Sequence, residues 1–247
     1  MNKLGTKAET LQMLYKKLEC AEILPSYIFT VGEWRADFWK VKNRFLSLNW
    51  SDKVIVRSSS QTEDMDDRSQ AGKYESVADV SGEEEFEIAV NKVIASYDDN
   101  NLENQVLVQP MLSDVCICGV AFTLDPNTLG NYYVINYDTH GSTSAVTAGN
   151  GIENKLYYRF KGQNGNVPER KSIGDAVSMA RMDYLCQALQ ELEEFFGKNN
   201  LDIEFAFTEG DVLYILQVRT LCIQGKPVNR ELQQAELGRI KEKISRE

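Results

Sequence analysis

Two apolar runs near the end of the chain, residues 203–207 and 212–218, flank a short polar segment at 208–211 that contains a glycine. Runs rich in β-branched and aromatic residues, joined by such a segment, are typical of a β-hairpin. The pattern therefore predicts two antiparallel strands that meet at a turn over residues 208–211.

Polar side chains follow one face of this predicted hairpin. Asp202 and Glu204 alternate with Ile203, so both carboxylates project from the same face of the first strand. Pairing around the turn sets Glu204 nearly opposite Gln217, with Arg219 just beyond. Carboxylate and amide oxygens suit a hard cation such as Mg²⁺, which proteins often share with the phosphates of a nucleotide. The alternative is an ordinary hairpin whose polar face is solvated.

Apolar residues also recur at helical spacing in five other segments. Thr6 followed by Glu9, and Ser81 followed by Glu84, are capping-box sequences that open two of these helices. The predicted helices begin at Thr6, cover residues 34–48, begin at Ser81, cover 172–197, and cover 228–247. The last is highly charged and has only a thin apolar stripe, which is typical of a helix that leaves a domain.

Short apolar runs predict further strands at 54–56, 105–108, 116–123, 132–137 and 156–160. Several strands at this spacing indicate an antiparallel sheet in the second half of the chain. The polar break at 98–103 is the best candidate for a boundary between lobes. We therefore expect an N-terminal lobe at 1–104, a C-terminal lobe with the hairpin at 105–226, and a charged helical tail or linker at 227–247.

Composition narrows the class of protein. The 247 residues carry a formal net charge of −10, which argues against a nucleic-acid-binding surface because phosphate backbones need clustered cations. No apolar stretch is long enough to span a membrane, and the N-terminus lacks the apolar core of a secretory signal. The five cysteines are irregularly spaced, and Cys116 and Cys118 are too close for a CxxC motif. We expect Cys116 and Cys118 to be buried thiols, and the cysteine pattern indicates a reducing cytoplasm.

Two cationic side chains, those of Lys7 and Arg57, occupy positions from which they could contact a phosphate group. Lys7 lies in the first turn of a predicted helix, where a cation is disfavoured unless an anion binds nearby. Arg57 ends a predicted strand and is followed by serines and by a loop that contains Ala71 and Gly72. The alternatives are a solvated surface lysine and an acidic, solvated loop.

Five motifs then stand in one order along residues 5–221: VIVRSS at 54–59, AG at 71–72, VQPM at 108–111, GVAFTLDP at 119–126, and DIE at 202–204 with ILQVR at 215–219. In this order they resemble the N-terminal nucleotide-binding domain of phosphoenolpyruvate synthase, pyruvate phosphate dikinase and rifampin phosphotransferase. The opening GTKA at 5–8 looks like the Gly-Gly-Lys-Gly-type start of that family. Each motif is weak alone, and the order makes the resemblance specific.

The resemblance implies an α+β, ATP-grasp fold, in which two lobes hold ATP between them. It implies that Lys7, Arg57 and Arg219 contact phosphates and act in catalysis. It implies that Glu204 and Gln217 ligate Mg²⁺ with support from Asp202. The remaining nucleotide contacts that it implies are Ala71 and Gly72 in a loop over the phosphates, and Gln109 and Met111 beside adenine.

The family relays phosphate through a histidine on a separate, swivelling domain. His140 lacks the surroundings of that carrier, so the resemblance implies a phosphohistidine domain outside this sequence. Ser144 stands where the family often has an acid. The motifs also look like a subgroup associated with capsular polysaccharide biosynthesis, which includes an L-glutamine kinase. A small acceptor, L-glutamine in that subgroup, would be phosphorylated while ATP becomes AMP and phosphate. The alternative is a non-catalytic nucleotide-sensing or interaction domain with the same fold.

Overall fold

The structure is a computed structural model that describes residues 2–50, 53–60, 74–139, 155–161 and 176–245. Its helices are α1 (Lys7–Leu14), α2 (Val31–Ala36), α3 (Phe38–Ser47), α4 (Gly82–Ala95), α6 (Ala176–Phe196) and α7 (Arg230–Ile244). Its strands are β1 (Tyr27–Thr30), β2 (Val54–Ser59), β3 (Ser76–Val80), β4 (Gln105–Pro110), β5 (Val115–Phe122), β6 (Tyr132–Asp138), β7 (Lys155–Phe160), β8 (Leu201–Thr208) and β9 (Leu213–Thr220).

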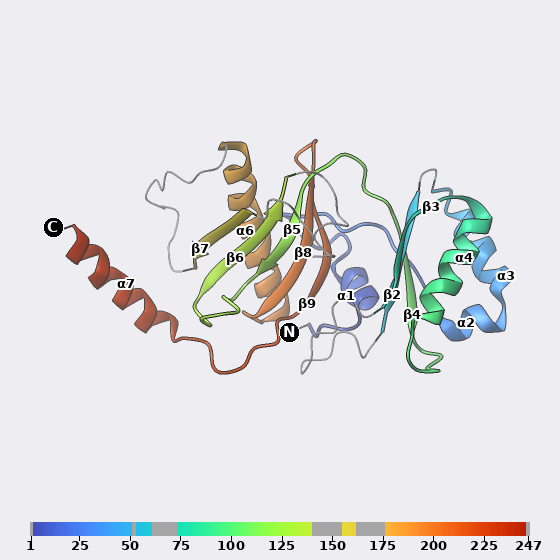
Figure 1. Cartoon of the computed structure of the whole chain (residues 1–247), viewed down its shortest axis with the longest axis horizontal. Helices are drawn as coiled ribbons and strands as arrows, with labels where there is room; N and C mark the ends of the chain where they lie inside the picture. The colour runs from blue at the N-terminus through green and yellow to red at the C-terminus, as the bar shows by residue number, and fades with distance from the viewer. Residues whose placement is uncertain (1, 51–52, 61–73, 140–154, 162–175, 246–247) are drawn as a thin grey trace.

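The strands form two antiparallel sheets, which stand beside each other in Figure 1. The first has the order β1-β4-β2-β3, and α2, α3 and α4 cover its outer face. Val56 and Val106 point to these helices and into an aromatic core, whereas Leu107, the neighbour of Val106, belongs to the core of the second lobe. Within that core the rings of Phe45 and Phe86 stack with their centroids 3.9 Å apart. This covered face leaves the other face of the sheet to meet the second lobe.

The second sheet has the order β7-β6-β5-β8-β9, and α6 packs on one face of it. Ile203, Ala121 and Ile135 are paired neighbours on that face, and they are buried against the helix. Glu204 is paired with Val120, which is paired with Asn136, so these residues project from the opposite face. The polar groups of the hairpin therefore lie on the side of the sheet that α6 does not cover.

Helix α1 joins the two lobes, and Figure 1 shows it between the sheets. Its capping box is present as predicted, because the Thr6 hydroxyl accepts from the Glu9 amide and the Glu9 carboxylate accepts from the Thr6 amide. Leu11 and Leu14 are fully buried in the same apolar cluster as α6. The first helix of the chain thus packs into the core of the C-terminal lobe, which brings its N-terminus close to β2.

Three predictions from the sequence need correction: one helix, one helix cap and the boundary between the lobes. The predicted helix at 34–48 is two helices, because the Asp37 side chain accepts from the Lys40 amide and starts α3 anew. Ser81 makes no side-chain cap hydrogen bond to α4, and its own amide donates to Glu85 instead. Strand β4 pairs with β1 and β2. The predicted boundary at 104/105 therefore separates β4 from the sheet in which it pairs.

The hairpin, the end of α6 and the course of α7 agree with the elements that the sequence predicted. Strands β8 and β9 pair around the turn at 208–211, as the sequence predicted. Helix α6 ends at Phe196, and Gly197 follows with a φ of 64°, the left-handed conformation that a helix stop favours. Helix α7 has no buried residue and extends away from the lobes, beyond the sheets in Figure 1. The charged tail is thus a helix that leaves the domain.

Candidate nucleotide site

Arg57 is the residue through which the polar faces of the two sheets meet. Along β2 the side chains of Ile55 and Arg57 alternate with the valines that face the helices, so Arg57 points to the second lobe. Its Nη2 donates to Glu204 Oε2 at 3.3 Å and to Gln217 Oε1 at 3.4 Å. The residue is only 9% exposed. Arg57 is therefore buried between the two sheets rather than solvated.

A β-bulge in the hairpin provides a third acceptor for this guanidinium. Glu204 pairs with Gln217 and Phe205 pairs with Ile215, so Leu216 has no opposite partner on β8. Arg57 Nη1 donates to the carbonyl of Leu216 at 3.0 Å. A bulge redirects backbone groups that would otherwise bond within the sheet, and bulges are frequent beside active sites. Here it turns a carbonyl toward the first lobe.

Glu204 and Gln217 face each other across the hairpin, as the pattern predicted. Gln217 is buried, and the Glu204 side chain is 19% exposed. In the structure the oxygens of both side chains converge on one cationic group, the Arg57 guanidinium. No cluster of three or more His, Cys, Asp or Glu side chains suited to a metal occurs among the described residues. One carboxylate and one amide are nevertheless a donor set that fits Mg²⁺, which retains waters and takes phosphate oxygens as further ligands.

Asp202 and Arg219 form a second, neighbouring ion pair on the hairpin. They pair directly across the strands, and Arg219 donates from Nε and Nη2 to Asp202 Oδ2 at 2.8 and 2.7 Å. Burial raises the pKa of the Asp202 carboxyl, although the charge and hydrogen bonds of Arg219 oppose that shift. Among the described residues, the buried side-chain atoms without a hydrogen-bond partner are Asp202 Oδ1 and Arg57 Nε. Both belong to this site, where a buried polar atom without a partner is costly unless it serves a ligand.

Lys7 comes to the same region from α1. Its Nζ donates to the carbonyl of Ser58 at 3.3 Å, and it is 4% exposed, so the solvated-lysine reading is wrong. The amide of Ala8 donates to the Ser59 hydroxyl at 2.9 Å. These bonds hold the start of α1 against the end of β2, next to Arg57. An added Cβ at Gly5 would come within 2.3 Å of Glu9 Oε2, which explains a glycine before the capping box.

The predicted hinge residues lie on and after β4. Gln109 shares a face with Arg57, since Ile55 pairs with Gln109 and Arg57 with Leu107. The Gln109 carboxamide is buried and donates to Leu24 and Ser26, and the Met111 amide donates to Lys53. Their polar groups thus fasten the strand to its surroundings. Met111 is half-buried, and its predicted contact with adenine stays a prediction.

Several predicted residues lie outside the described part of the chain. These are Ala71 and Gly72 of the predicted phosphate loop, His140, and Ser144. What the structure does bring together is Lys7, Arg57, Glu204, Gln217, Asp202 and Arg219. This set combines cations with carboxylate and amide oxygens at the junction of two sheets. It can bind a polyphosphate together with a divalent cation.

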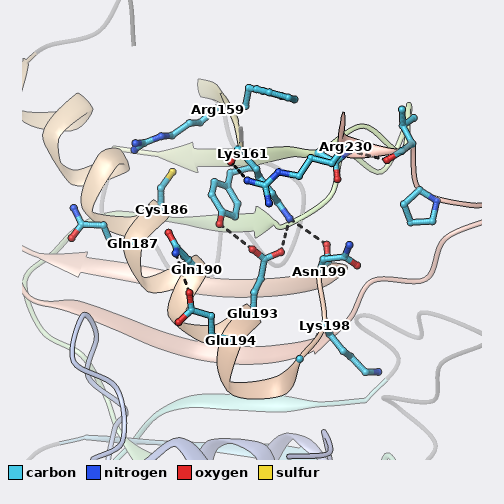
Figure 2. Close-up of a pocket in the computed structure, with 16 residues that line it drawn as sticks. Arg159, Lys161, Cys186, Gln187, Gln190, Glu193, Glu194, Lys198, Asn199 and Arg230 are labelled. Atoms are coloured by element: carbon cyan, nitrogen blue, oxygen red, sulfur yellow. Dashed lines mark hydrogen bonds and ion pairs between the residues drawn. The ribbon is translucent and has the colours of Figure 1, made fainter. Parts of the chain in front are cut away.

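A second set of polar residues has no counterpart in the sequence analysis. Lys161, Glu193 and Arg230 meet on the α6 side of the second sheet, as Figure 2 shows, and the Tyr133 hydroxyl donates to Glu193 there. They come from β6, the end of β7, α6 and the start of α7. No motif or spacing links them, and no signal in one sequence identifies them.

Known proteins resemble this chain in sequence. The family model of the pyruvate phosphate dikinase AMP/ATP-binding domain matches residues 35–152, which confirms the family resemblance. That range includes Arg57, Gln109 and Met111 but not Lys7 or the hairpin. A curated relative, the uncharacterized phosphotransferase YvkC of Bacillus subtilis (strain 168), is 25% identical over 214 residues. The alignment spans 81% of this chain and 24% of the relative, so the chain corresponds to about a quarter of that protein.

Solved structures agree on the fold. The D-alanine-D-alanine ligase of Helicobacter pylori superimposes with a TM-score of 0.52 at 13% identity, over 87% of this chain and 54% of the ligase. At that identity the likeness shows the fold, which is ATP-grasp and α+β as the resemblance implied. Among the described residues, no helix is both long and apolar enough to cross a membrane.

Proposed function

The chain is related to the AMP/ATP-binding domains of the pyruvate phosphate dikinase family, and from this relation we propose that its two sheets hold Mg·ATP as the nucleotide-binding part of a phosphotransferase. The contact of Arg57 with Glu204 and Gln217 is the observation that carries the proposal. It joins a guanidinium of one lobe, a group that commonly binds phosphate, to two side-chain oxygens of the other lobe, which are groups that commonly bind Mg²⁺. A ligand that bears both phosphates and a divalent cation matches both halves of this contact.

In this proposal the phosphates are bound by cations from both lobes. Arg57 approaches from the first sheet, Lys7 from α1 between the two sheets, and Arg219 from the hairpin. Arg57 presents a planar fork of donors, which suits two phosphate oxygens at once. Asp202 keeps Arg219 oriented through two hydrogen bonds. Ala71 and Gly72 would add backbone donors over the same phosphates.

Glu204 and Gln217 would hold the Mg²⁺ ion in the proposed complex. Bound there, the ion would neutralise charge on the phosphate oxygens during transfer. The residues of the chain have to supply only two oxygens, since Mg²⁺ keeps waters and substrate oxygens as its other ligands. Adenine would lie against Met111, beside the strand that Gln109 fastens.

The acceptor and the carrier complete the proposal. ATP and water would yield AMP and inorganic phosphate while one phosphoryl group goes to a histidine of a swivelling domain and then to a small acceptor, with L-glutamine as the first candidate. Because the chain spans about a quarter of the phosphotransferase that it matches, these parts would belong to other regions of a longer protein.

A thermal-shift measurement tests nucleotide binding by this chain. ATP and a non-hydrolysable ATP analogue, each with and without Mg²⁺, should raise the melting temperature, and more so with the metal. Ligand at about 100 times its Kd stabilises a protein by about 2.7 kcal/mol, which is readily measured. GTP and AMP serve as specificity controls. A melting temperature that neither nucleotide nor Mg²⁺ changes would contradict the proposal.

A second experiment distinguishes catalysis from sensing. A separately produced phosphohistidine domain of a relative is added together with L-glutamine, and AMP is measured. Formation of AMP only when the histidine domain is present supports the phosphotransferase. Tight Mg·ATP binding without AMP under any of these conditions would favour a nucleotide-sensing domain instead.

A further inference from the structure

A pocket of about 710 Å³ lies on the α6 side of the second sheet, away from the nucleotide site. Strands β6 and β7 form one wall, α6 forms another, and the segment before α7 closes one end (Figure 2). Tyr133 and Arg159 line it from the sheet face that also carries Ile135, whereas Glu204 projects from the opposite face. The sheet therefore separates this pocket from the proposed phosphate site.

The floor of the pocket is a buried ion pair. Lys161 Nζ contacts Glu193 Oε1, and the two side chains are 7% and 15% exposed. The Tyr133 hydroxyl donates to the other carboxylate oxygen of Glu193 at 3.0 Å, and Lys161 Nζ lies 5.1 Å from the centre of the Tyr133 ring. Burial lowers the pKa of Lys161 although Glu193 opposes that shift, and nearby Arg230 acts in the same direction as burial. Each oxygen of the Glu193 carboxylate thus has a partner, Lys161 or Tyr133, and among the described residues Glu193 forms no ion pair with Arg230.

Arg230 is that second cation. Its Nη2 donates to the carbonyl of Lys161, and within the described residues it forms no ion pair. Arg159, on another wall, already pairs with Asp183 at 3.0 Å. Arg230 therefore adds positive charge beside a buried lysine, in a chain whose formal net charge is −10. The lining carries the cations Arg159, Lys161, Lys198 and Arg230 against the carboxylates Glu193 and Glu194, and such an excess of cations in a concave site favours an anion.

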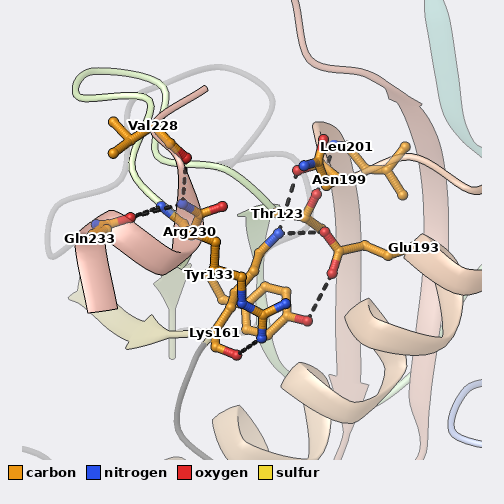
Figure 3. A network of polar contacts seen from close by, with 10 residues as sticks. Thr123, Tyr133, Lys161, Glu193, Asn199, Leu201, Val228, Arg230 and Gln233 are labelled. Carbon is orange, nitrogen blue, oxygen red and sulfur yellow. Dashed lines mark hydrogen bonds and ion pairs between the residues drawn. The ribbon is translucent and has the colours of Figure 1, made fainter. Parts of the chain in front are cut away.

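The segment that carries Arg230 is held in place on the lobe, as Figure 3 shows. The Asn131 carboxamide donates to the Val228 carbonyl and to Gln233 Oε1, both at 2.8 Å. The Val228 amide donates in turn to the Leu129 carbonyl at 2.9 Å. These bonds lie on either side of Arg230 along the chain. The guanidinium is thus positioned at the pocket by the backbone that flanks it.

The remaining polar wall of the pocket is formed by α6. Gln187 and Gln190 are exposed on the pocket side, and Gln190 donates to Glu194 at 3.0 Å. Cys186 also lines the pocket, but burial raises the pKa of its thiol to about 12, so it is no nucleophile. The pocket offers hydrogen-bond donors and a cation rather than reactive groups. It is suited to binding rather than to catalysis.

We propose that this pocket is a second ligand site, which binds a small oxyanion, a phosphate or carboxylate group, through the Arg230 guanidinium, with the Gln190 carboxamide of α6 on the facing wall. A planar guanidinium binds such groups with two parallel hydrogen bonds. The ligand would join the start of α7 to α6 and would thereby fix the direction in which α7 leaves the lobe. This site is independent of the nucleotide site, because a β-sheet lies between the two.

Site-resolved NMR tests the proposal on the whole chain. Inorganic phosphate and malonate are titrated separately while amide signals of residues 131, 187, 190 and 233 are followed, with glycerol as the neutral control. We expect saturable shifts at these residues with at least one of the two anions. Arg230→Gln should weaken that binding about tenfold or more, since it removes a hydrogen bond to a charged group. Arg239→Gln, an exposed arginine of the same helix, is the matched control and should leave the affinity unchanged.

The outcomes separate the alternatives. Preference for phosphate over malonate, or the reverse, identifies the oxyanion. Equal weakening by the Arg230 and Arg239 variants would mean a general charge effect and would overturn the proposal, as would the absence of saturable shifts at residues 190 and 233. Gln190→Glu places a carboxylate in the wall that faces Arg230 and should also abolish binding. Shifts confined to Lys7, Arg57 and their neighbours would assign the anion to the nucleotide site instead.

Discussion

Arg57 and Glu204 stand 147 residues apart in the sequence, and their side chains meet between the two lobes with Arg57 Nη2 3.3 Å from Glu204 Oε2. Each residue belongs to a different sheet. The contact therefore depends on how the lobes pack and reports on whether they are closed. It also brings a guanidinium that could bind phosphate next to a carboxylate that could bind a metal ion. The first two predictions rest on this contact.

Glu204→Ala should remove the Mg²⁺ dependence of ATP binding. The variant should keep its fold, because the side chain lies at the lobe junction, 19% exposed, and outside the apolar core. In the longer protein, turnover should fall about 100-fold or more, the range seen when charge stabilisation of a transition state is lost. Calorimetry with and without Mg²⁺ measures the first effect. Glu209→Ala, in the exposed hairpin turn, is the control, and an Mg²⁺ dependence equal to that of the wild type would disprove the metal assignment.

Arg57→Lys should weaken ATP binding about tenfold although the charge is conserved, because one ammonium cannot replace the planar fork. The variant also loses a donor to the Leu216 carbonyl that the bulge exposes. Fluorescence or calorimetric titration with Mg·ATP gives the affinity. Arg181→Lys, which alters an arginine paired with Asp211, is the matched control. An ATP affinity equal to that of the wild type would exclude Arg57 from the phosphate site.

Asp202 should make the free energy of unfolding depend on pH. Burial raises the pKa of its carboxyl in the folded chain above the ordinary value of 3.8. The folded state therefore binds this proton more tightly than the unfolded state, and stability falls as pH rises from about 4 through the raised pKa. Urea unfolding of the wild type and of Asp202→Asn at several pH values isolates this contribution. The wild type should lose stability relative to the variant as pH rises, and the opposite slope would show that Arg219 outweighs burial.

Gly119→Ala should destabilise the second sheet. An added Cβ would come within 2.2 Å of the Asn136 carbonyl oxygen and 2.9 Å of Tyr137 Cα, both backbone atoms that cannot move easily. Overpacking of this kind costs about 1–3 kcal/mol or more. Gly238→Ala on α7 is the contrast, since nothing lies within 4 Å of an added Cβ there and alanine favours a helix. Chemical denaturation should show a loss for the first variant and none for the second.

Residues 1–247 alone should bind ATP without completing a kinase cycle. ATP that contacts both lobes binds the closed arrangement better and shifts the population toward it. Small-angle scattering should show a smaller radius of gyration with Mg·ATP than without it, and mass spectrometry should find negligible AMP and no phosphorylated L-glutamine. Steady formation of both products by this chain alone would require an acceptor site within it.

The sequence pattern by itself predicts much of the local structure. The hairpin and the pairing of Glu204 with Gln217 follow from a period-2 pattern around a turn, because both depend only on neighbouring residues. The capping box at Thr6 and the stop at Gly197 are equally local. Local reasoning failed where a competing local bond intervened, as when Asp37 capped a new helix inside the predicted one.

Only the tertiary structure determines which distant segments these elements pair with and pack against. Strand β4 belongs to the first sheet because its backbone pairs with β1 and β2, a choice that no local pattern encodes. The bulge that turns the Leu216 carbonyl toward Arg57, and the burial that raises the pKa of Asp202, arise from packing between distant segments. The pocket at Lys161 and Arg230 likewise exists only where α6 and the start of α7 converge on the sheet. Side-chain periodicity determines which face a residue occupies, but the free energy of packing two sheets determines which residue lies opposite.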